Sequence, residues 1–259
     1  MATDNPIQPH SCAVAGRLAG DNFLHITWLH SGFTEVELER EWYCSLELLR
    51  SGASGCDKVA AGVIVNRMES SLMRLQQPRI APVPEAEWDE TAQEIMRPFK
   101  AAGADHNVFK TMLNHPDLMR RWLVFANHIL FKSTLAPRER ELIILRIGYL
   151  CDAGYEWSQH VEVGRKAGMT DAEIMTAQSG PDTPGLSEQD RLLLQATDEL
   201  HADAFITDPT WQALSEHFSD QQMMDIIFTV GQYNLVSMAL NSFGVQRDPG
   251  LPGWDLSET

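Results

Sequence analysis

Residues 135–174 predict two consecutive helices, and the first of them is too apolar to lie on a protein surface. The run from Leu142 to Leu150 reads LIILRIGYL, which is longer than most strands and lacks the polar side of a surface helix. This helix is expected to begin near Pro137, because proline suits the first helical position. Gly154 interrupts the apolar run, and a second helix is expected from Tyr155 to Ala167. A buried helix followed at once by another predicts an αα-hairpin within an all-α core.

The predicted hairpin carries two acids and a histidine. Glu156 and His160 are four residues apart on one helix face, so the carboxylate can orient the imidazole. Glu141 lies on the preceding helix, and a rise of about 1.5 Å per residue puts it and His160 at unequal heights above the turn. Direct contact between these two is therefore left open. A purely structural interpretation is also open, in which Glu139 and Glu141 favour the helix start and His160 is a satisfied, partly buried histidine.

Three motifs in this region form a specific combination. They are L-x-P-R-x-R-E-L-x-I-L-R from Leu135, Y-E-W-x-Q-H from Tyr155 and G-M-T-D-x-E-I from Gly168. They resemble the carboxymuconolactone decarboxylase superfamily, which includes the alkylhydroperoxidase D-like (AhpD-like) proteins. The resemblance extends from about Arg79 to the segment GQYNLVSMALNSFGV. It implies an all-α, AhpD-like helical bundle built around the αα-hairpin, and a homo-oligomer, commonly a trimer or a hexamer.

The chain departs from the peroxidase branch of this superfamily. That branch has a glutamate, a C-x-x-C pair and a histidine four residues after the second cysteine. In this chain Glu141 and His160 match the glutamate and the histidine, whereas Ala153 and Glu156 occupy the cysteine positions. Thiol peroxidase chemistry is disfavoured, since it needs one thiolate to attack the peroxide and a second to resolve the sulfenic acid. Cys151 lies nearby, and we expect it to be a small packed hydrophobe without a near partner.

The chemistry that is left is proton transfer without a metal or an organic cofactor, as the resemblance to the decarboxylases implies. We assign His160 as the general acid/base, Glu156 as its orienting partner and Glu141 as an acid that positions substrate or water. The expected reaction is decarboxylation of a lactone or a related small organic acid, with secondary metabolism as one setting. The alternatives are an isomerase or dehydratase acting on a larger metabolite, and a non-catalytic oligomeric binding protein.

Four further side chains are candidates for substrate contact. Tyr155 and Trp157 flank the first acid of the second helix, His128 lies on the helix before the hairpin, and Tyr233 lies on the last helix. Each has a structural alternative. The aromatic side chains are of the kind that fills a core, and a lone histidine among apolar neighbours is commonly structural.

Composition favours a soluble, globular enzyme of small molecules. The net charge of −16 argues against binding to nucleic acid or anionic membranes. No stretch of about 20 residues lacks charges or polar breaks, so no membrane span is expected. The cysteines at positions 12, 44, 56 and 151 have neither metal-ligand nor disulfide-scaffold spacing. We therefore expect a cytoplasmic protein that holds no metal and no cofactor.

The first 67 residues differ from the rest of the chain. Only Glu35 to Leu49 shows a helical period there, and no targeting signal is evident. We therefore divide the chain into an N-terminal extension, 1–67, and a carboxymuconolactone decarboxylase-like domain, 68–259. One hypothesis is that the working protein starts at Met68, and the alternative is that the extension is a partner-binding arm. In the domain, further helices are expected over residues 85–102, 107–113, 116–131, 187–204 and 223–243.

Overall fold

The computed structural model describes residues 13–17, 23–27 and 73–257. The chain divides into two units, residues 1–66 and 67–259, and each is described by itself. That the working protein starts at Met68 stays a prediction.

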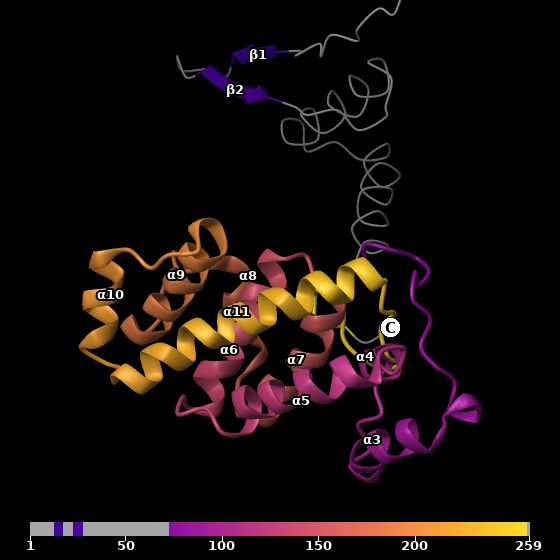
Figure 1. Ribbon diagram of the computed structural model, residues 1–259. Helices are drawn as coiled ribbons and strands as arrows, with labels where there is room; N and C mark the ends of the chain where they lie inside the picture. Colours follow the sequence, from indigo (N-terminus) through magenta and orange to yellow (C-terminus); the bar gives the residue numbers. More distant parts are fainter. Residues whose placement is uncertain (1–12, 18–22, 28–72, 258–259) are drawn as a thin grey trace, which may run out of the picture. The chain divides into compact units, whose positions relative to one another are not determined.

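A pair of strands is described in the first unit (Figure 1). Strand β1 (Ala13–Arg17) pairs antiparallel with β2 (Phe23–Thr27), and Ala13 lies opposite Thr27. The sequence patterns did not predict these strands. The helical period from Glu35 to Leu49 lies outside the described residues.

Every regular element between residues 73 and 257 is helical, which confirms the all-α prediction for the second unit (Figure 1). The elements are η1 (Glu85–Glu87), α3 (Glu90–Ala101), α4 (Asn107–Met112), α5 (Pro116–Phe131), α6 (Pro137–Leu150), α7 (Gly154–Lys166), α8 (Asp171–Ser179), α9 (Glu188–Asp203), α10 (Asp208–Ser215) and α11 (Asp220–Phe243). The bounds of α3, α4, α5, α6, α7, α9 and α11 agree with the expected helices to within about five residues at each end, and boundaries predicted from a single sequence are typically wrong by a few residues. No range was predicted for α8 or α10.

Helix α6 is the central helix of this unit. Every residue from Arg140 to Gly148 is buried, and the helix packs against α7, α8, α9 and α11. Its side chains divide between two apolar clusters. Ile143 and Ile144 pack with residues of α9 and α11, whereas Leu142 packs with residues of α7 and α8. The apolar run therefore fills the interior, and it holds any polar group on α6 away from water.

The hairpin turn places the start of α7 directly against α6. Asp152 adopts a left-handed conformation with φ of 49°, and Ala153 is the N-cap of α7. Gly154, which was expected to break the helix, is instead the first residue of α7. A Cβ atom added to Gly148 would lie 3.6 Å from Cγ of Glu156. Gly148 on α6 thus lies directly beside the first acid of α7, at a spacing that an added Cβ atom would also allow.

The C-terminal tail, residues 245–257, is held by side chains of α7. Trp157 Nε1 donates a hydrogen bond to the carbonyl of Gly253 at 3.0 Å, and Ser158 Oγ donates to the carbonyl of Pro252 at 2.6 Å. Both side chains are fully buried. These bonds satisfy polar groups that would otherwise be left unpaired in the interior.

Asp248 provides a second attachment of the tail. Its carboxylate accepts hydrogen bonds from the hydroxyl of Tyr155 and from Nε2 of Gln159, both at 2.7 Å. It also accepts the backbone N–H of Asn107 at the start of α4, at 3.1 Å. The tail therefore links α7 to α4.

Candidate active site

The hairpin brings together the three polar residues singled out from the sequence. Nδ1 of His160 lies 2.6 Å from Oε2 of Glu141, and Nε2 lies 2.9 Å from Oε1 of Glu156. The contact between Glu156 and His160 is the expected one on a single helix face. The contact with Glu141 answers the question that spacing left open, and it exists because α6 and α7 pack closely. One imidazole ring thus lies between two carboxylates, and all three groups are buried.

Arg140 completes this buried charge cluster, and the sequence analysis did not identify it. Its Nε and one terminal nitrogen each lie 3.1 Å from Oε1 of Glu141. Both oxygens of Glu141 therefore have a cationic partner, one from Arg140 and one from His160. The side chain of Glu141 is completely buried, so this pairing compensates its desolvation. Glu141 has no oxygen left to bind a substrate.

The two carboxylates keep His160 charged. Burial of the ring disfavours its cationic form, but the charges and hydrogen bonds of Glu141 and Glu156 outweigh this effect and raise the pKa of His160 from 6.5 to about 10. The ring is therefore an imidazolium at neutral pH, with both N–H groups directed to carboxylates. Two acids and two cations, including Arg140, make the cluster neutral in total.

Glu156 differs from Glu141 in having one oxygen free of protein partners. Its Oε1 pairs with His160, whereas we find no hydrogen bond or ion pair for Oε2 among residues 73–257. Glu156 also occupies the position of the second cysteine in the peroxidase pattern. A carboxylate with one oxygen fixed by a cation and one oxygen unoccupied can exchange a proton with a bound molecule.

Tyr233 reaches the site from α11, as predicted for a substrate-contacting residue. Its ring lies edge-on to the His160 ring, with centroids 4.9 Å apart and an interplanar angle of 84°. Burial and the negative charges of Glu156 and Glu141 raise the pKa of Tyr233 well above its usual value. The hydroxyl therefore keeps its proton and can act as a donor. Its role towards a substrate stays a prediction.

Two buried hydroxyl groups lie one helical turn before and after Tyr233. Thr229 Oγ1 has no hydrogen-bond partner within the described part of the chain, and the hydroxyl of Ser237 has the Cys151 thiol as its one neighbour for a weak hydrogen bond. Residues four apart share a helix face, so both hydroxyls belong to the side of α11 that borders His160. Unpaired buried hydroxyls are uncommon in folded proteins and call for a partner such as water or a ligand. Hydropathy patterns did not reveal them, because they sit inside an apolar helix.

Other predicted substrate contacts point elsewhere. Tyr155 and Trp157 direct their polar atoms to the C-terminal tail, and the Trp157 ring packs with Leu142 in the core. These positions match the structural alternative. The side chain of His128 is about half exposed on α5, with Nε2 4.0 Å from Oδ1 of Asp225. None of the three is seen to contact the His160 ring.

Cys151 packs against the apolar cluster of α6, α9 and α11, as expected, and its thiol also has polar neighbours. Its thiol donates to Oδ1 of Asn234 at 3.1 Å, and Sγ lies 3.9 Å from Nδ1 of His201. Burial, with a smaller contribution from the charge of Glu156, raises the pKa of the thiol. The thiol is therefore held in its neutral form, which is a poor nucleophile.

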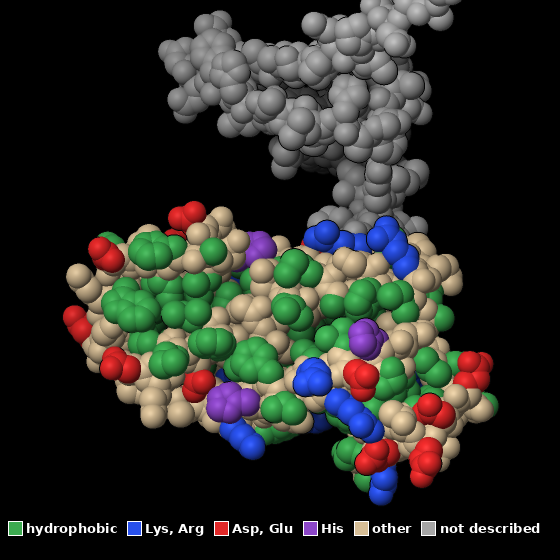
Figure 2. Space-filling view, in the orientation of Figure 1, with side chains coloured by type: hydrophobic (Ala, Val, Ile, Leu, Met, Phe, Trp, Pro, Cys, Tyr) green, Lys and Arg blue, Asp and Glu red, His purple; other side chains and the backbone are tan. Residues whose placement is uncertain are grey.

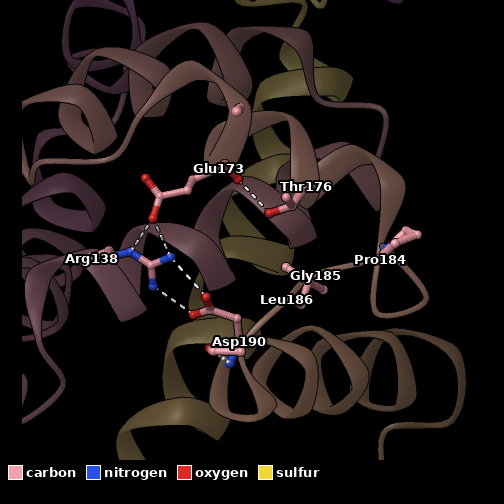
Figure 3. Close-up of a pocket in the computed structure, with 9 residues that line it drawn as sticks. Arg138, Glu173, Thr176, Pro184, Gly185, Leu186 and Asp190 are labelled. Carbon is pink, nitrogen blue, oxygen red and sulfur yellow. Dashed lines mark hydrogen bonds and ion pairs between the residues drawn. The ribbon is translucent and has the colours of Figure 1, made fainter.

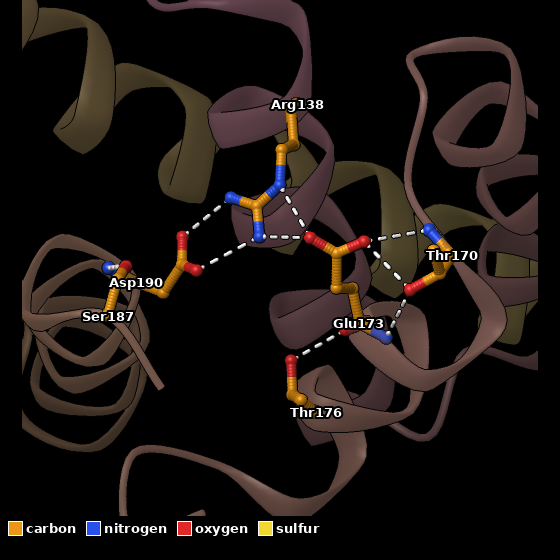
Figure 4. A network of polar contacts seen from close by, with 6 residues as sticks. All are labelled: Arg138, Thr170, Glu173, Thr176, Ser187 and Asp190. Atoms are coloured by element: carbon orange, nitrogen blue, oxygen red, sulfur yellow. Dashed lines mark hydrogen bonds and ion pairs between the residues drawn. The ribbon is translucent and has the colours of Figure 1, made fainter. Parts of the chain in front are cut away.

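A second polar cluster surrounds Arg138 at the start of α6. Arg138 lies 2.7 Å from both Glu173 on α8 and Asp190 on α9 (Figure 4). Hydrogen bonds from the backbone of Thr170 and from Arg138 lower the pKa of Glu173 to about 2. A pocket of about 220 Å³ lies beside this network and is also lined by residues 184–187 (Figure 3). Since all three charged groups are paired, the network joins three helices and we interpret it as structural.

The described residues contain no group of three His, Cys, Asp or Glu side chains arranged to hold a metal ion.

Comparison with known sequences supports the resemblance of the hairpin. The model of the carboxymuconolactone decarboxylase family matches residues 116–199. This range begins at the first residue of α5 and contains the four members of the charge cluster. No match was found among the curated proteins.

Solved structures with an AhpD-like fold are similar to this chain. An uncharacterised peroxidase-related protein from Ralstonia eutropha, described as an alkylhydroperoxidase AhpD core, is 23% identical with a TM-score of 0.58, over 65% of this chain and 92% of that one. A peroxidase-related protein from Silicibacter is 19% identical with a TM-score of 0.56, over 68% and 92%. The debrominase Bmp8, in complex with 2,3,4-tribromopyrrole, is 13% identical with a TM-score of 0.54, over 67% and 93%.

At these identities the structural likeness concerns the fold, and the family assignment rests on the hairpin motifs together with the family match. The family match over residues 116–199 and the AhpD-like fold together support the carboxymuconolactone decarboxylase and AhpD-like superfamily that the hairpin motifs suggested, and this chain lacks the C-x-x-C pair of the peroxidase branch.

Proposed function

We propose that this chain is a cofactor-independent enzyme whose substrate is a small organic molecule, and that Glu156 exchanges a proton with this substrate. The observation that carries the proposal is the buried His160 ring with a carboxylate at each nitrogen. Because its pKa is raised to about 10, the ring is protonated at neutral pH and is not a free base. The roles assigned from the sequence are therefore exchanged: Glu156 meets the substrate, and His160 supports Glu156.

Each member of the cluster has a separate task in this proposal. Oε2 of Glu156 accepts or returns the proton, and the Nε2–H group of His160 supplies a proton to Glu156 when the carboxylate must act as an acid. Glu141 holds the opposite side of the ring and stabilises its charge. Arg140 binds Glu141 and fixes the position of that carboxylate beside the ring.

The finer proposal is decarboxylation of a lactone or a related small organic acid. In this reaction the bond between the carboxylate and the adjacent carbon breaks, CO₂ leaves, and a conjugated carbonyl of the substrate takes up the electron pair. In this proposal the hydroxyl of Tyr233, whose ring lies beside His160, donates to an oxygen that gains charge. A proton from the Glu156–His160 pair then adds to the carbon, and water restores the proton to the enzyme. The atoms and charges balance without an external oxidant or reductant.

An isomerase or dehydratase is a second candidate, and the unoccupied Oε2 of Glu156 favours it equally. In an isomerisation the same oxygen removes a proton next to a carbonyl and returns it to another carbon. Thiol peroxidase activity is not proposed, since the superfamily's cysteine positions hold Ala153 and Glu156 and Cys151 is a buried neutral thiol.

The proposal is tested with the full chain and a panel of small lactone acids and β-keto acids in D₂O, followed by NMR. Release of bicarbonate identifies a decarboxylase, and deuterium exchange without it identifies an isomerase. Glu156→Gln should lower turnover about 100-fold or more, the usual contribution of a general acid–base group. Glu162→Gln is the matched control, because Glu162 lies on the same helix and pairs with Arg165 near the surface.

Two outcomes would contradict the proposal. Turnover that survives Glu156→Gln would remove this residue from the chemistry. A wild-type chain that binds panel members without converting them, with affinity unchanged in Glu156→Gln, would instead indicate the oligomeric binding protein.

A further inference from the structure

Helix α11 has a second apolar face, on the side opposite to the active site. Tyr233 faces His160, whereas the opposite side of the helix is open to solvent. We call this side the outer stripe of α11, and it consists of Met224, Phe228, Gly231, Leu235 and Met238. Its four large side chains are 52–59% exposed. Figure 2 shows hydrophobic side chains gathered on the face that α11 crosses. A helix that is apolar on both sides normally has a partner on both sides.

The spacing of the outer stripe points to a helical partner. Its members follow one another at intervals of four, three, four and three residues. This is the a and d pattern of a coiled-coil surface, which forms a straight row for packing against another helix. The helix carries no charged residue after Asp225. The stripe therefore resembles the centre of an interface, where charged residues are depleted.

Gly231 lies at the middle of the outer stripe, and no packing contact within the described fold requires a glycine there. A Cβ atom added there would meet no atom within 4 Å. A glycine inside a helix costs about 1 kcal/mol relative to alanine, so an exposed one with free space around it invites an explanation. A bare backbone at this point lets a second helix cross closely.

The outer stripe also has nearly the same sequence in both directions from Gly231. A methionine lies seven residues before it and another seven residues after it, Met224 and Met238. A large apolar residue lies three residues before it and another four residues after it, Phe228 and Leu235. Such symmetry is what a two-fold contact requires, because both copies then use the same surface.

We propose that the outer stripe of α11 binds the outer stripe of a second copy of this chain, with the two helices antiparallel and crossing at Gly231. Met224 of one copy then meets Met238 of the other, and Phe228 meets Leu235. Tyr233 remains on the far side of the helix, so the contact buttresses the helix that borders the active site. This inference does not depend on the proposed reaction.

The exposed area is sufficient for such a contact. Phe125 on α5 extends the stripe, because its ring packs edge-on against Phe228 with centroids 6.0 Å apart and is itself 37% exposed. Five large side chains that are roughly half exposed offer about 500 Å² per copy. Two copies then bury about 1,000 Å², the lower bound for a specific interface. A membrane fits less well: α11 is long and apolar enough to span one, but half of its apolar window is buried in the fold.

Light scattering of the full chain provides the first test. The wild type should have the mass of an assembly with an even number of copies. Phe228→Glu should break the two-fold contact and give a species of half that mass. Phe205→Glu is the matched control, because Phe205 is similarly exposed (56%) but lies outside α11. It should leave the mass unchanged.

Disulfide cross-linking tests the geometry and stays informative if Phe228→Glu fails to fold. Under mild oxidation Gly231→Cys alone should give covalent dimers, since this position lies on the two-fold axis, with the wild type as the control for the native cysteines. Met238→Cys alone should not cross-link, whereas the double variant Met224→Cys/Met238→Cys should. A monomeric wild type would overturn the proposal. So would an assembly whose mass does not change in Phe228→Glu and which Gly231→Cys does not cross-link. Monomers that float with phosphatidylcholine–phosphatidylglycerol vesicles would also overturn it.

Discussion

The charge of His160 can be measured directly, and the structure predicts how it responds to the loss of one carboxylate. Nitrogen-15 NMR of the imidazole ring should show an imidazolium at pH 7 and at pH 9, because Glu141 and Glu156 raise the pKa of His160 to about 10. Glu156→Gln removes one of the two charges and keeps the shape of the side chain. The pKa of His160 should then fall by more than half of the distance to its usual value, because burial of the ring still disfavours the cation while only one carboxylate is left to oppose it.

The same change has a consequence for stability. The pKa of His160 is higher in the folded chain, at about 10, than the usual value of 6.5. The interaction therefore stabilises the fold fully below pH 6.5 and is lost as the pH rises through 10. Between these values the folded state holds one proton more, so the free energy of unfolding falls by about 1.4 kcal/mol per pH unit. From pH 7 to pH 9 the wild type should lose roughly 3 kcal/mol through this group, and Glu156→Gln less than half of that.

Urea unfolding at pH 7, 8 and 9 measures this difference, with Glu162→Gln as the control for other titrating groups. The losses of stability over this range should differ by roughly 1.5–3 kcal/mol between the wild type and the variant. A neutral imidazole at pH 7, or equal slopes for the wild type and Glu156→Gln, would refute the reasoning that two carboxylates hold the proton.

Three further predictions concern the scaffold and the thiol. Arg146→Met should lower the free energy of unfolding by about 3 kcal/mol, since the guanidinium is buried and binds Asp198 at 2.6 Å and the carbonyl of Ala177 at 3.0 Å; a loss under 1 kcal/mol in urea unfolding would show the pair to be dispensable. Trp157→Phe removes one buried hydrogen bond to the tail and should cost about 1 kcal/mol, with earlier hydrogen exchange in residues 245–257 as the local readout. Cys151 should react slowly with iodoacetamide at pH 7 because burial raises its pKa; labelling as fast as free cysteine would contradict this.

The fold of the second unit could be predicted because its signals are local. Proline at the first turn, capping boxes such as Thr170–Glu173 and the apolar period each act within one helix. The contact of Glu156 with His160 was predictable for the same reason, since it depends on spacing along α7 alone. The strands β1 and β2 lie in a segment where no clear alternation was recognised.

The rest of the site depends on how helices pack, which spacing does not determine. Glu141 reaches His160 only because α6 and α7 pack closely against each other. Arg140 is adjacent to Glu141, and residues next to each other on a helix normally diverge, so nothing in the pattern joined them. The exchange of roles between Glu156 and His160 likewise required knowing that both ring nitrogens are occupied.

Helix α7 contacts the charge cluster with some of its side chains and the C-terminal tail with others. This has practical consequences for handling the protein. Glu156 and His160 reach the charge cluster, while the side chains between and beside them hold the C-terminal tail. A tag fused directly after the tail, or a trimmed C-terminus, would therefore strain the helix that carries the reactive carboxylate. Lost activity in such a variant would report a displaced backbone and not a missing reactive group. Purification handles are better placed behind a flexible linker, and saturation mutagenesis of residues 155–160 should find few tolerated positions.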